Sequence, residues 1–439
     1  MSDDKRSLTA GTIKISQAVL TNFKGESIDI TPLISTLVIK ESVYLIHSIY
    51  EFLIIDSVAL LEKYVITGNE KIRLELVKSD SSNKQDEVQI TKYLALAGIG
   101  AYNRPKPNIQ GYTLTAITET AMVSTSMKVC KSVKGIIGNI ISGLYKEIMY
   151  KSPLNSIDEE TDGNFSIVLP NKTYKDTFVF LLKKAQRSNG NVFYMFETLF
   201  HNTIITSYEE IIGQSSVEEF RQVDGETEVK DTSANFDENR TRILDISSNL
   251  GASHYDGFKT GAFTAVVHDV DIAEKRYTRI PFNSHNSNLP KLNADYSISN
   301  DYTVGDKTLE DLNEAVSYFV NRNTMAFGNQ LNISGKSDKT IAKRRAVFSN
   351  QYALSHKITV HGDTRVRAGV CIDIWIPQAT DPTIVSEHKD ELMSGKYMVA
   401  SIDHMIDNLN NEYTMKVSIK KDSNNVSAFE GKYDYLEQK

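Results

Sequence analysis

The segment SGKYMVASIDHMIDNLNNEYTMKVSIKKDS, residues 394–423, indicates how the C-terminal part of this chain folds. Apolar and polar residues alternate on both sides of NLNN (408–411), which is the pattern of two strands joined by a hairpin loop. Regular alternation places His404 on the face opposite Val399 and Asp403. The sequence therefore predicts that His404 is a hydrogen-bonded structural residue of a closing hairpin, and that SIDHMID is not a catalytic or metal-binding cluster.

The composition is that of a globular protein rich in strands. A chain of 439 residues is long enough for about two to four domains. With 40% hydrophobic and 24% charged residues it does not have the composition of a disordered protein. Twenty-one Tyr against one Trp, together with many Ile and Val, favour strands. The net charge of −7 provides no general electrostatic attraction to nucleic acid.

Cysteine content and hydropathy bear on the compartment. The two cysteines, Cys130 and Cys371, are far apart and have neither a CxxC partner nor a nearby histidine, so we expect both to be buried and apolar. The absence of a disulfide framework fits a reducing cytoplasm. The N-terminus, MSDDKRSLTAG, lacks the apolar core of a signal peptide, and no apolar run approaches the roughly 20 residues that span a bilayer. We therefore expect a soluble chain without stable membrane insertion.

The first part of the chain, 1–125, is predicted to be a small β barrel or sandwich. Its strands are recognised by period-two alternation, as in TGNEKIRLELVKS, where Ile72, Leu74 and Leu76 share one face. Short strands at close spacing are typical of such all-β domains. The expected strands lie at 36–42, 51–57, 67–79, 88–99 and 111–120.

Residues 126–248 are predicted to form an α+β insert domain. Apolar residues recur at helical spacing in SVKGIIGNIISGLYKEIMY (132–150) and again in TYKDTFVFLLKKAQ (173–186), where Thr173 and Asp176 resemble a capping box. Strands are expected at VFYMFE and TIITSYE, followed by an acidic, turn-rich stretch.

A second β domain is expected from 249–282 and 336–425 together. Its strands lie within 261–282, 356–362, 369–377 and the closing hairpin, and a basic helix is expected from Asp338 to Ala353. Between its two parts, 283–335 is predicted to be a loop-rich excursion with one short helix. That helix would carry Leu309, Leu312, Val316 and Phe319 on one face. Residues 426–439 are a polar C-terminal tail.

No catalytic, cofactor-binding or metal-binding motif is present. In His268-Asp269-Val270-Asp271 the strand alternation separates the histidine from the carboxylates, so we expect a solvated strand face. GIIGNIISG (135–143) lies in a helical pattern rather than in a phosphate-binding loop, and DEETDG (158–163) is expected to be an acidic surface turn. The run KTIAKRRAVF fits a solvated helix face or a subunit contact. Catalytic carboxylates paired in space are not excluded by sequence.

Two groups of segments carry a family resemblance. The first is TLVIKES, EFLIIDS and ITGNEKIRLEL within 36–76; the second is HKITVHGDTRVRAGVCIDIWIP (356–377) with the closing hairpin. The matching positions are mostly apolar strand residues and the turn glycines Gly68, Gly362, Gly369 and Gly395. Together these segments resemble the central baseplate hub protein of T-even-type contractile phage tails and related injection machines. The order of elements resembles that family over most of the chain.

The resemblance implies a β-rich α+β fold, with two tube-type β-barrel or sandwich domains and an α+β insert between them. It implies a homotrimer whose six β domains form a pseudo-hexameric ring. The expected partners are a central spike protein, the tail-tube protein and the surrounding baseplate wedge proteins, with DNA only passing through the lumen. The expected location is the tail baseplate of the virion, after assembly in the host cytoplasm.

We expect no enzymatic activity and no cofactor, because the insert lacks a convincing acid/base pair or zinc set. The alternatives are a tail-associated cell-wall hydrolase or a receptor-binding tail protein. A hydrolase would use the insert as its catalytic domain. Charged residues crowd the tight turn before the apolar strand 370–376. If the protein is a hub, we expect this turn to contact a neighbouring subunit. The turn residues concerned are Asp363, Thr364, Arg365 and Arg367.

Overall fold

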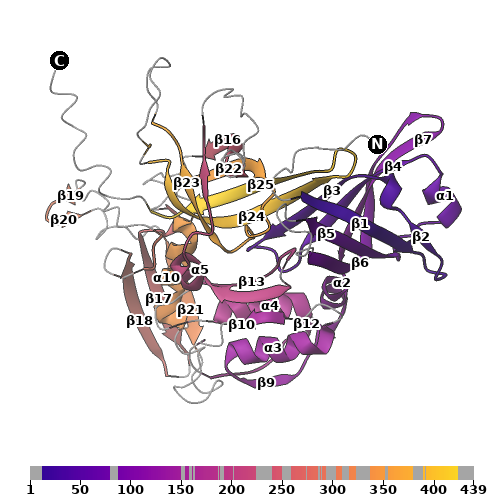
Figure 1. Ribbon diagram of the computed structural model, residues 1–439. Coiled ribbons are helices and arrows are strands. Elements are labelled where there is room, and N and C mark those ends of the chain that lie inside the picture. Colours follow the sequence, from indigo (N-terminus) through magenta and orange to yellow (C-terminus); the bar gives the residue numbers. More distant parts are fainter. Residues whose placement is uncertain are drawn as a thin grey trace, which may run out of the picture.

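The computed structural model describes most of the chain (Figure 1). The described residues are 12–79, 88–149, 154–157, 161, 164–185, 187, 192–200, 202–223, 240–249, 259–272, 274–284, 287, 289–292, 303–308, 316–322, 337–351, 354–378, 389–390 and 392–423. The expected helix face at Leu309 and Leu312, most of the acidic turn 158–163 and the tail 426–439 lie outside them.

The helices and strands follow one another in three groups. The first group is β1 (Thr12–Thr21), β2 (Ser27–Asp29), η1 (Thr31–Leu33), β3 (Ile34–Ser42), β4 (Ile49–Asp56), α1 (Leu60–Tyr64), β5 (Lys71–Ser79), β6 (Val88–Lys106), β7 (Ile109–Thr118) and α2 (Glu119–Ser126). The second group is β8 (Lys128–Val129), β9 (Ser132–Gly135), α3 (Ile137–Ile148), β10 (Leu154–Ile157), β11 (Phe165–Val168), β12 (Lys172–Thr173), α4 (Tyr174–Lys184), β13 (Phe193–Glu197), β14 (Thr203–Ser207), α5 (Tyr208–Gly213), β15 (Glu219–Arg221) and β16 (Ile243–Asn249). The third group is β17 (Thr264–Asp271), β18 (Arg276–Asn283), β19 (Thr303–Val304), β20 (Lys307–Thr308), β21 (Ser317–Arg322), α10 (Ser337–Asn350), β22 (Leu354–His361), β23 (Cys371–Trp375), β24 (Gly395–Asp407) and β25 (Glu412–Lys421).

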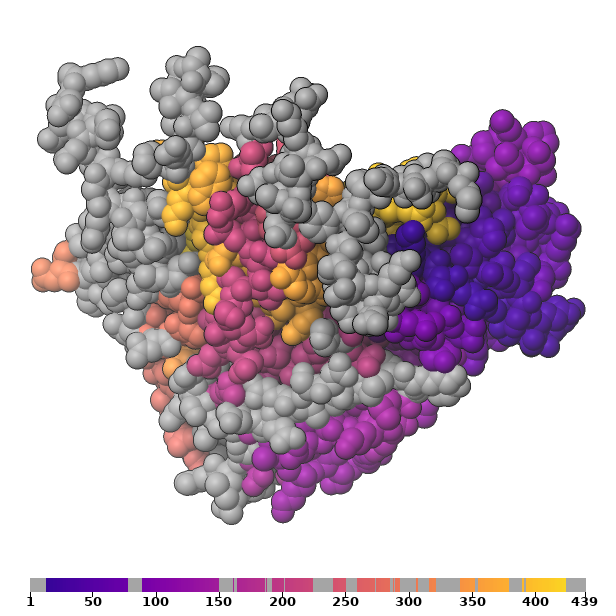
Figure 2. All heavy atoms as spheres, viewed as in Figure 1, coloured from indigo at the N-terminus to yellow at the C-terminus, as the bar shows by residue number. Residues whose placement is uncertain are grey.

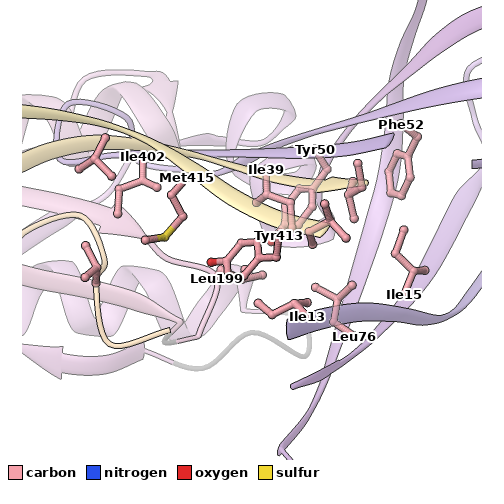
Figure 3. Close-up of a cluster of buried hydrophobic side chains, with 14 of the residues drawn as sticks. Ile13, Ile15, Ile39, Tyr50, Phe52, Leu76, Leu199, Ile402, Tyr413 and Met415 are labelled. Atoms are coloured by element: carbon pink, nitrogen blue, oxygen red, sulfur yellow. The ribbon is translucent and has the colours of Figure 1, made fainter. Parts of the chain in front are cut away.

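One large sheet joins the N-terminal and C-terminal β regions. Its strand order is β16-β22-β25-β24-β3-β4-β7-β6-β5-β1-β2, and β23 extends it beside β24. The two regions meet where β3 and β24 pair antiparallel, with His404 opposite Ile39. A single apolar core lies beneath this seam, and Figure 3 shows side chains from both regions packed in it, including Ile39, Ile402 and Met415. The predicted β-rich α+β fold is confirmed.

A bulge in β24 changes which face its side chains occupy. The register with β25 shifts between Val399 and Ser401, so Ala400 is an extra residue in the strand. Val399 and Ile402 therefore both lie in the main core, and His404 is buried on the same side. The prediction that Val399 and His404 face opposite ways is wrong, because period-two alternation fails across a bulge. Downstream of the bulge the prediction for Asp403 is confirmed, since it is half-buried on the outer face.

The predicted helices of the insert are present as α3 and α4. The Thr173 side chain accepts a hydrogen bond from the backbone N–H of Asp176 and caps α4, as the sequence indicated. Buried residues of both helices form a second core with the sheet β10-β14-β13, below the large sheet in Figure 1. Helix α10 matches the predicted basic helix, and Arg344 on it donates to the carbonyls of Leu182 and Lys183 at the end of α4.

A separate three-stranded sheet, β18-β17-β21, packs on α10. Residues 261–282 were predicted to belong to the same β domain as the closing hairpin; in the structure β17 pairs with β18 and with β21 of the excursion. Phe319, expected on a helix, lies on strand β21. The solvated-face prediction is wrong for Asp269 and Asp271, which are 3% and 1% exposed. The division into domains stays a prediction.

Two further expectations concern cysteine burial and membranes. Cys371 is buried as predicted, but Cys130 is exposed, which contradicts the prediction. None of the helices within the described ranges is long and apolar enough to cross a membrane.

Candidate functional site: a buried polar junction

Polar side chains gather beneath the seam that joins the two β regions. Alternation along β3 turns Leu37, Ile39 and Glu41 toward the core, and Glu41 is 1% exposed. The hairpin β24–β25 brings His404 and Tyr413 to the same place. A buried carboxylate beneath an apolar sheet needs compensating hydrogen bonds, and the structure supplies them.

Glu41 binds two backbone amides from distant parts of the chain. Its Oε1 accepts from the N–H of Ala368 at 2.7 Å, and its Oε2 accepts from the N–H of Leu199 at 2.8 Å. The Nε2 of His404 lies 3.5 Å from Oε2. Burial by itself raises the pKa of Glu41, but His404 and the two amides outweigh it, and the net pKa is lowered. Glu41 thus ties β3 to the insert and to the turn before β23.

His404 is held from its other side by Tyr413. Its Nδ1 lies 2.8 Å from the Tyr413 hydroxyl, which confirms the prediction of a hydrogen-bonded histidine. Burial raises the pKa of Tyr413 well above its ordinary value. Gly362 lies against the ring of Tyr413, and a Cβ at this position would be 1.7 Å from Cδ1. This close approach explains why a glycine occupies the turn.

A second polar group lies on β13, β6 and the loop before β4. The Oε2 of Glu197 accepts from the hydroxyl of Thr118 at 3.2 Å and from the backbone N–H of Ser48 at 3.4 Å. Burial raises the pKa of Glu197 despite the opposing charge of Lys92. The Nζ of Lys92 donates to the carbonyl of Thr198 at 3.3 Å, and burial lowers its pKa. This group links the insert to the N-terminal β region.

His47 completes the second group. Its Nε2 lies 2.8 Å from the hydroxyl oxygen of Ser124, and its Nδ1 lies 3.9 Å from Oε2 of Glu197. Burial, with a smaller effect of Lys175, lowers the pKa of His47 to about 4. The sequence does not indicate this junction, because its members come from segments that are distant in sequence and have no common motif.

The junction has the properties of a structural connection. Glu41, His404 and Glu197 are each at most 1% exposed, so a substrate cannot reach them without opening of the fold. Within the described ranges, no three His, Cys, Asp or Glu side chains are grouped so that they could hold a metal ion. What the arrangement does is connect the two β regions and the insert through hydrogen bonds between segments distant in sequence.

The structure places the predicted contact residues beside this junction. Asp363 is 5% exposed and accepts hydrogen bonds from the backbone and the guanidinium of Arg365. Arg365 also pairs with Glu218, which in turn pairs with Arg240 at 2.8 Å. Burial raises the pKa of the Asp363 carboxyl, but the hydrogen bonds that Arg365 donates to it stabilise its charge, and the net pKa is lowered.

The other two predicted residues do not join that ion-pair network. Thr364 is half-buried. Arg367 is half-buried too, and burial lowers its pKa while Glu41 opposes the shift. The turn thus brings Asp363 and Arg365 together and leaves Thr364 and Arg367 outside. Their contact with another subunit stays a prediction.

Comparison with known proteins gives similarity in structure only. No protein-family model matches the chain, and no curated protein matches it. The 43 kDa tail protein of prophage MuSo2 from Shewanella oneidensis is 12% identical, over 93% of this chain and 98% of that one, with a TM-score of 0.51. The chain shares the fold of this prophage tail protein.

Two other solved structures are similar over nearly the whole chain. The tail protein from Neisseria meningitidis MC58 is 10% identical, covering 94% of this chain and 96% of that one, with a TM-score of 0.49. An E. coli component of the type VI secretion system is 9% identical over 93% of this chain and 76% of that one, with a TM-score of 0.39. At these identities the likeness concerns the fold alone.

Proposed function

We propose that the chain is a structural hub protein of a phage tail baseplate. Three copies form a ring in which six β domains alternate, so that the ring joins a six-fold tail tube to a three-fold central spike. Surrounding wedge proteins bind its outside, and DNA passes through its lumen. The protein acts in the virion, has no enzymatic activity, and is assembled in the host cytoplasm. The fold shared with a prophage tail protein supports a role in a tail.

The pairing of β3 with β24 is the observation that carries this proposal. It runs from Thr36–Ser42 opposite Ser401–Asp407 and makes one sheet from the two β regions. A chain that carries two β units in one sheet supplies two neighbouring positions of a ring, so three chains can supply six. The buried junction beneath the seam supports this reading, because it fixes the two units relative to each other.

The mass of the protein in solution tests the proposal. A trimer of the 49.2 kDa chain would have a mass of about 148 kDa by light scattering. Addition of the candidate spike protein should shift this mass further. A monomer at all concentrations would contradict the ring, and clearing of peptidoglycan in a zymogram would favour the hydrolase instead.

The predicted contact turn is tested by charge reversal. If Arg365 meets a neighbouring subunit, Arg365→Glu should reduce assembly, whereas Arg276→Glu on the small sheet should not. Arg365 also pairs with Glu218 and Asp363 within the chain, so the melting temperature of the Arg365→Glu variant must be measured together with its mass in solution. Unchanged assembly of a folded Arg365→Glu protein would remove this turn from the interface.

A further inference from the structure

The hairpin formed by the ends of β6 and β7 projects from the N-terminal β region. We call residues 97–108 the arm. Residues 99–108 are all exposed, with Ile99 at 41% and Tyr102 at 57%. The arm is the purple projection at the upper right of Figures 1 and 2. Exposed apolar residues on a projecting hairpin need an explanation, since they contribute nothing to the core of their own chain.

One edge of the arm is not paired. Strand β5 pairs with β6 only from Val88 to Ala95, and among the described residues β6 then pairs with β7 alone. The other edge of the hairpin is covered, because β7 pairs with β4 from Gln110 to Ile117. The N–H of Leu96 still donates to the carbonyl of Glu70, and the backbone of β6 beyond Leu96 is therefore available to another strand until Pro105, which has no N–H to donate.

The arm is basic within an acidic protein. No Asp or Glu occurs in the arm, whereas Arg104 and Lys106 do. Since the whole chain has a charge of −7 and the arm contributes +2, the rest of the chain carries −9. Arg104 and Lys106 are both exposed at the tip of the arm. An acidic partner therefore fits the arm electrostatically.

A complementary edge lies at the other end of the same sheet. Within the described part of the chain, β16 pairs along its length with β22 only. It contains no basic residue, its Asp245 is exposed, and its Leu244 is 45% exposed. Six strands separate β16 from β6 in the sheet order, and Figure 1 shows the two well apart. The arm of one chain therefore meets this edge only on another copy.

We propose that the arm binds the β16 edge of a second copy of this chain. Ile99 and Tyr102 provide apolar contact with Leu244, and the cations at the tip face Asp245. Such a contact joins two different surfaces, so it repeats head to tail and closes into a ring when the rotation between copies allows it. The added strand pairing is a known mode of recognition. The inference rests on the proposed ring and names one surface that closes it.

A charge swap tests the arm. The variant Arg104→Glu/Lys106→Glu should weaken self-association by at least about tenfold in sedimentation. The control Lys24→Glu/Arg276→Glu has the same change in net charge on exposed side chains elsewhere and should assemble like the wild type. Adding Asp245→Lys to the arm variant should restore assembly. Failure of the swap to restore an impaired assembly would place the arm on a different surface and overturn the inference.

A cross-link provides a second test that does not depend on charge. Chains with Tyr102→Cys are mixed with chains with Leu244→Cys, both in a Cys130→Ser background because Cys130 is exposed. A short bismaleimide should give a covalent dimer only from the mixture. Cysteine variants that assemble like the wild type but give no such dimer overturn the arm contact and leave the ring intact. A wild type that is monomeric throughout overturns both.

Discussion

Replacing His47 by glutamine should flatten the dependence of stability on pH between pH 6.5 and 4. His47 is 9% exposed and hydrogen-bonded to Ser124, with its Nε2 2.8 Å from the hydroxyl oxygen. Burial, assisted by the charge of Lys175, lowers its pKa to about 4. A glutamine can keep the bond to Ser124 but takes up no proton in this range. The variant thus removes the titration and retains the contact.

The magnitude follows from the two pKa values. In the unfolded chain the imidazole takes up a proton near its ordinary pKa of 6.5, whereas in the folded chain it does so only at about 4. Between these values the unfolded state binds more protons, so stability falls as the pH falls. The contribution of the neutral His47 to the free energy of unfolding is fully present above pH 6.5 and is lost below about pH 4. A gap of about 2.5 between the pKa values corresponds to about 3 kcal/mol.

Glu197 acts in the opposite direction and must be separated from this effect. The Oε2 of Glu197 lies 3.9 Å from the Nδ1 of His47, and an ionised carboxylate there would favour the charged imidazole. Burial raises the pKa of Glu197, so it becomes neutral in the folded protein at a higher pH than in the unfolded chain. By itself this adds stability as the pH falls. Because Glu197 is present in both proteins, subtracting the two pH profiles largely removes its contribution.

The assay is denaturant unfolding followed by circular dichroism at a series of pH values from 4 to 7.5. Wild type should lose about 3 kcal/mol more than His47→Gln over this range. The matched control is Ser124→Ala, which removes the hydrogen bond of His47 but keeps the imidazole. It should cost about 1 kcal/mol at every pH and keep the steep profile of the wild type. Parallel profiles for wild type and His47→Gln would refute the reasoning.

Two further predictions concern the junction and glycine packing. Gly362→Ala should destabilise the protein by about 3 kcal/mol, because the new Cβ would collide with the buried Tyr413 ring. Gly143→Ala on α3 should stabilise it by about 0.5–1 kcal/mol, because no atom lies within 4 Å of the new Cβ and alanine favours a helix. Melting temperatures shifting in the same direction would contradict this. Glu41→Gln should cost about 2–3 kcal/mol at pH 7, since hydrogen bonds to its carboxylate are charge-assisted. Because the folded pKa of Glu41 is lowered, this cost should shrink as acid protonates the wild-type side chain, and a cost independent of pH would contradict it.

Local patterns predicted the individual elements well. Alternation identified β3, β4 and β5, and helical spacing identified α3 and α4, because each pattern reports a face that must be buried. The capping residue Thr173 was recognisable since its side chain satisfies a backbone N–H within the same turn. These features depend on residues close in sequence.

The parts that could not be predicted depend on distant segments. Asp269 is buried because two segments from later in the chain enclose β17: β21 pairs with it at the edge, and α10 packs on the sheet. The bulge at Ala400 has no signature in the alternation of the strand itself. Glu41 gave no sign of its role, since its amide donors lie at Leu199 and Ala368. Tertiary contacts decide such positions, and a single sequence does not show them.

The buried pair of Glu41 and His404 has a consequence for how the two β regions are joined. A shift of β3 against β24 by one residue would turn Glu41 to the outer face and leave the amides of Ala368 and Leu199 without their acceptor. The same shift would turn Leu37 and Ile39 outward, and a shift by two residues, which keeps the apolar face buried, would still move the carboxylate away from the two amides. An unpaired buried amide costs about 1–3 kcal/mol. The polar junction therefore specifies the relative position of the two β regions, which a ring built from both regions requires.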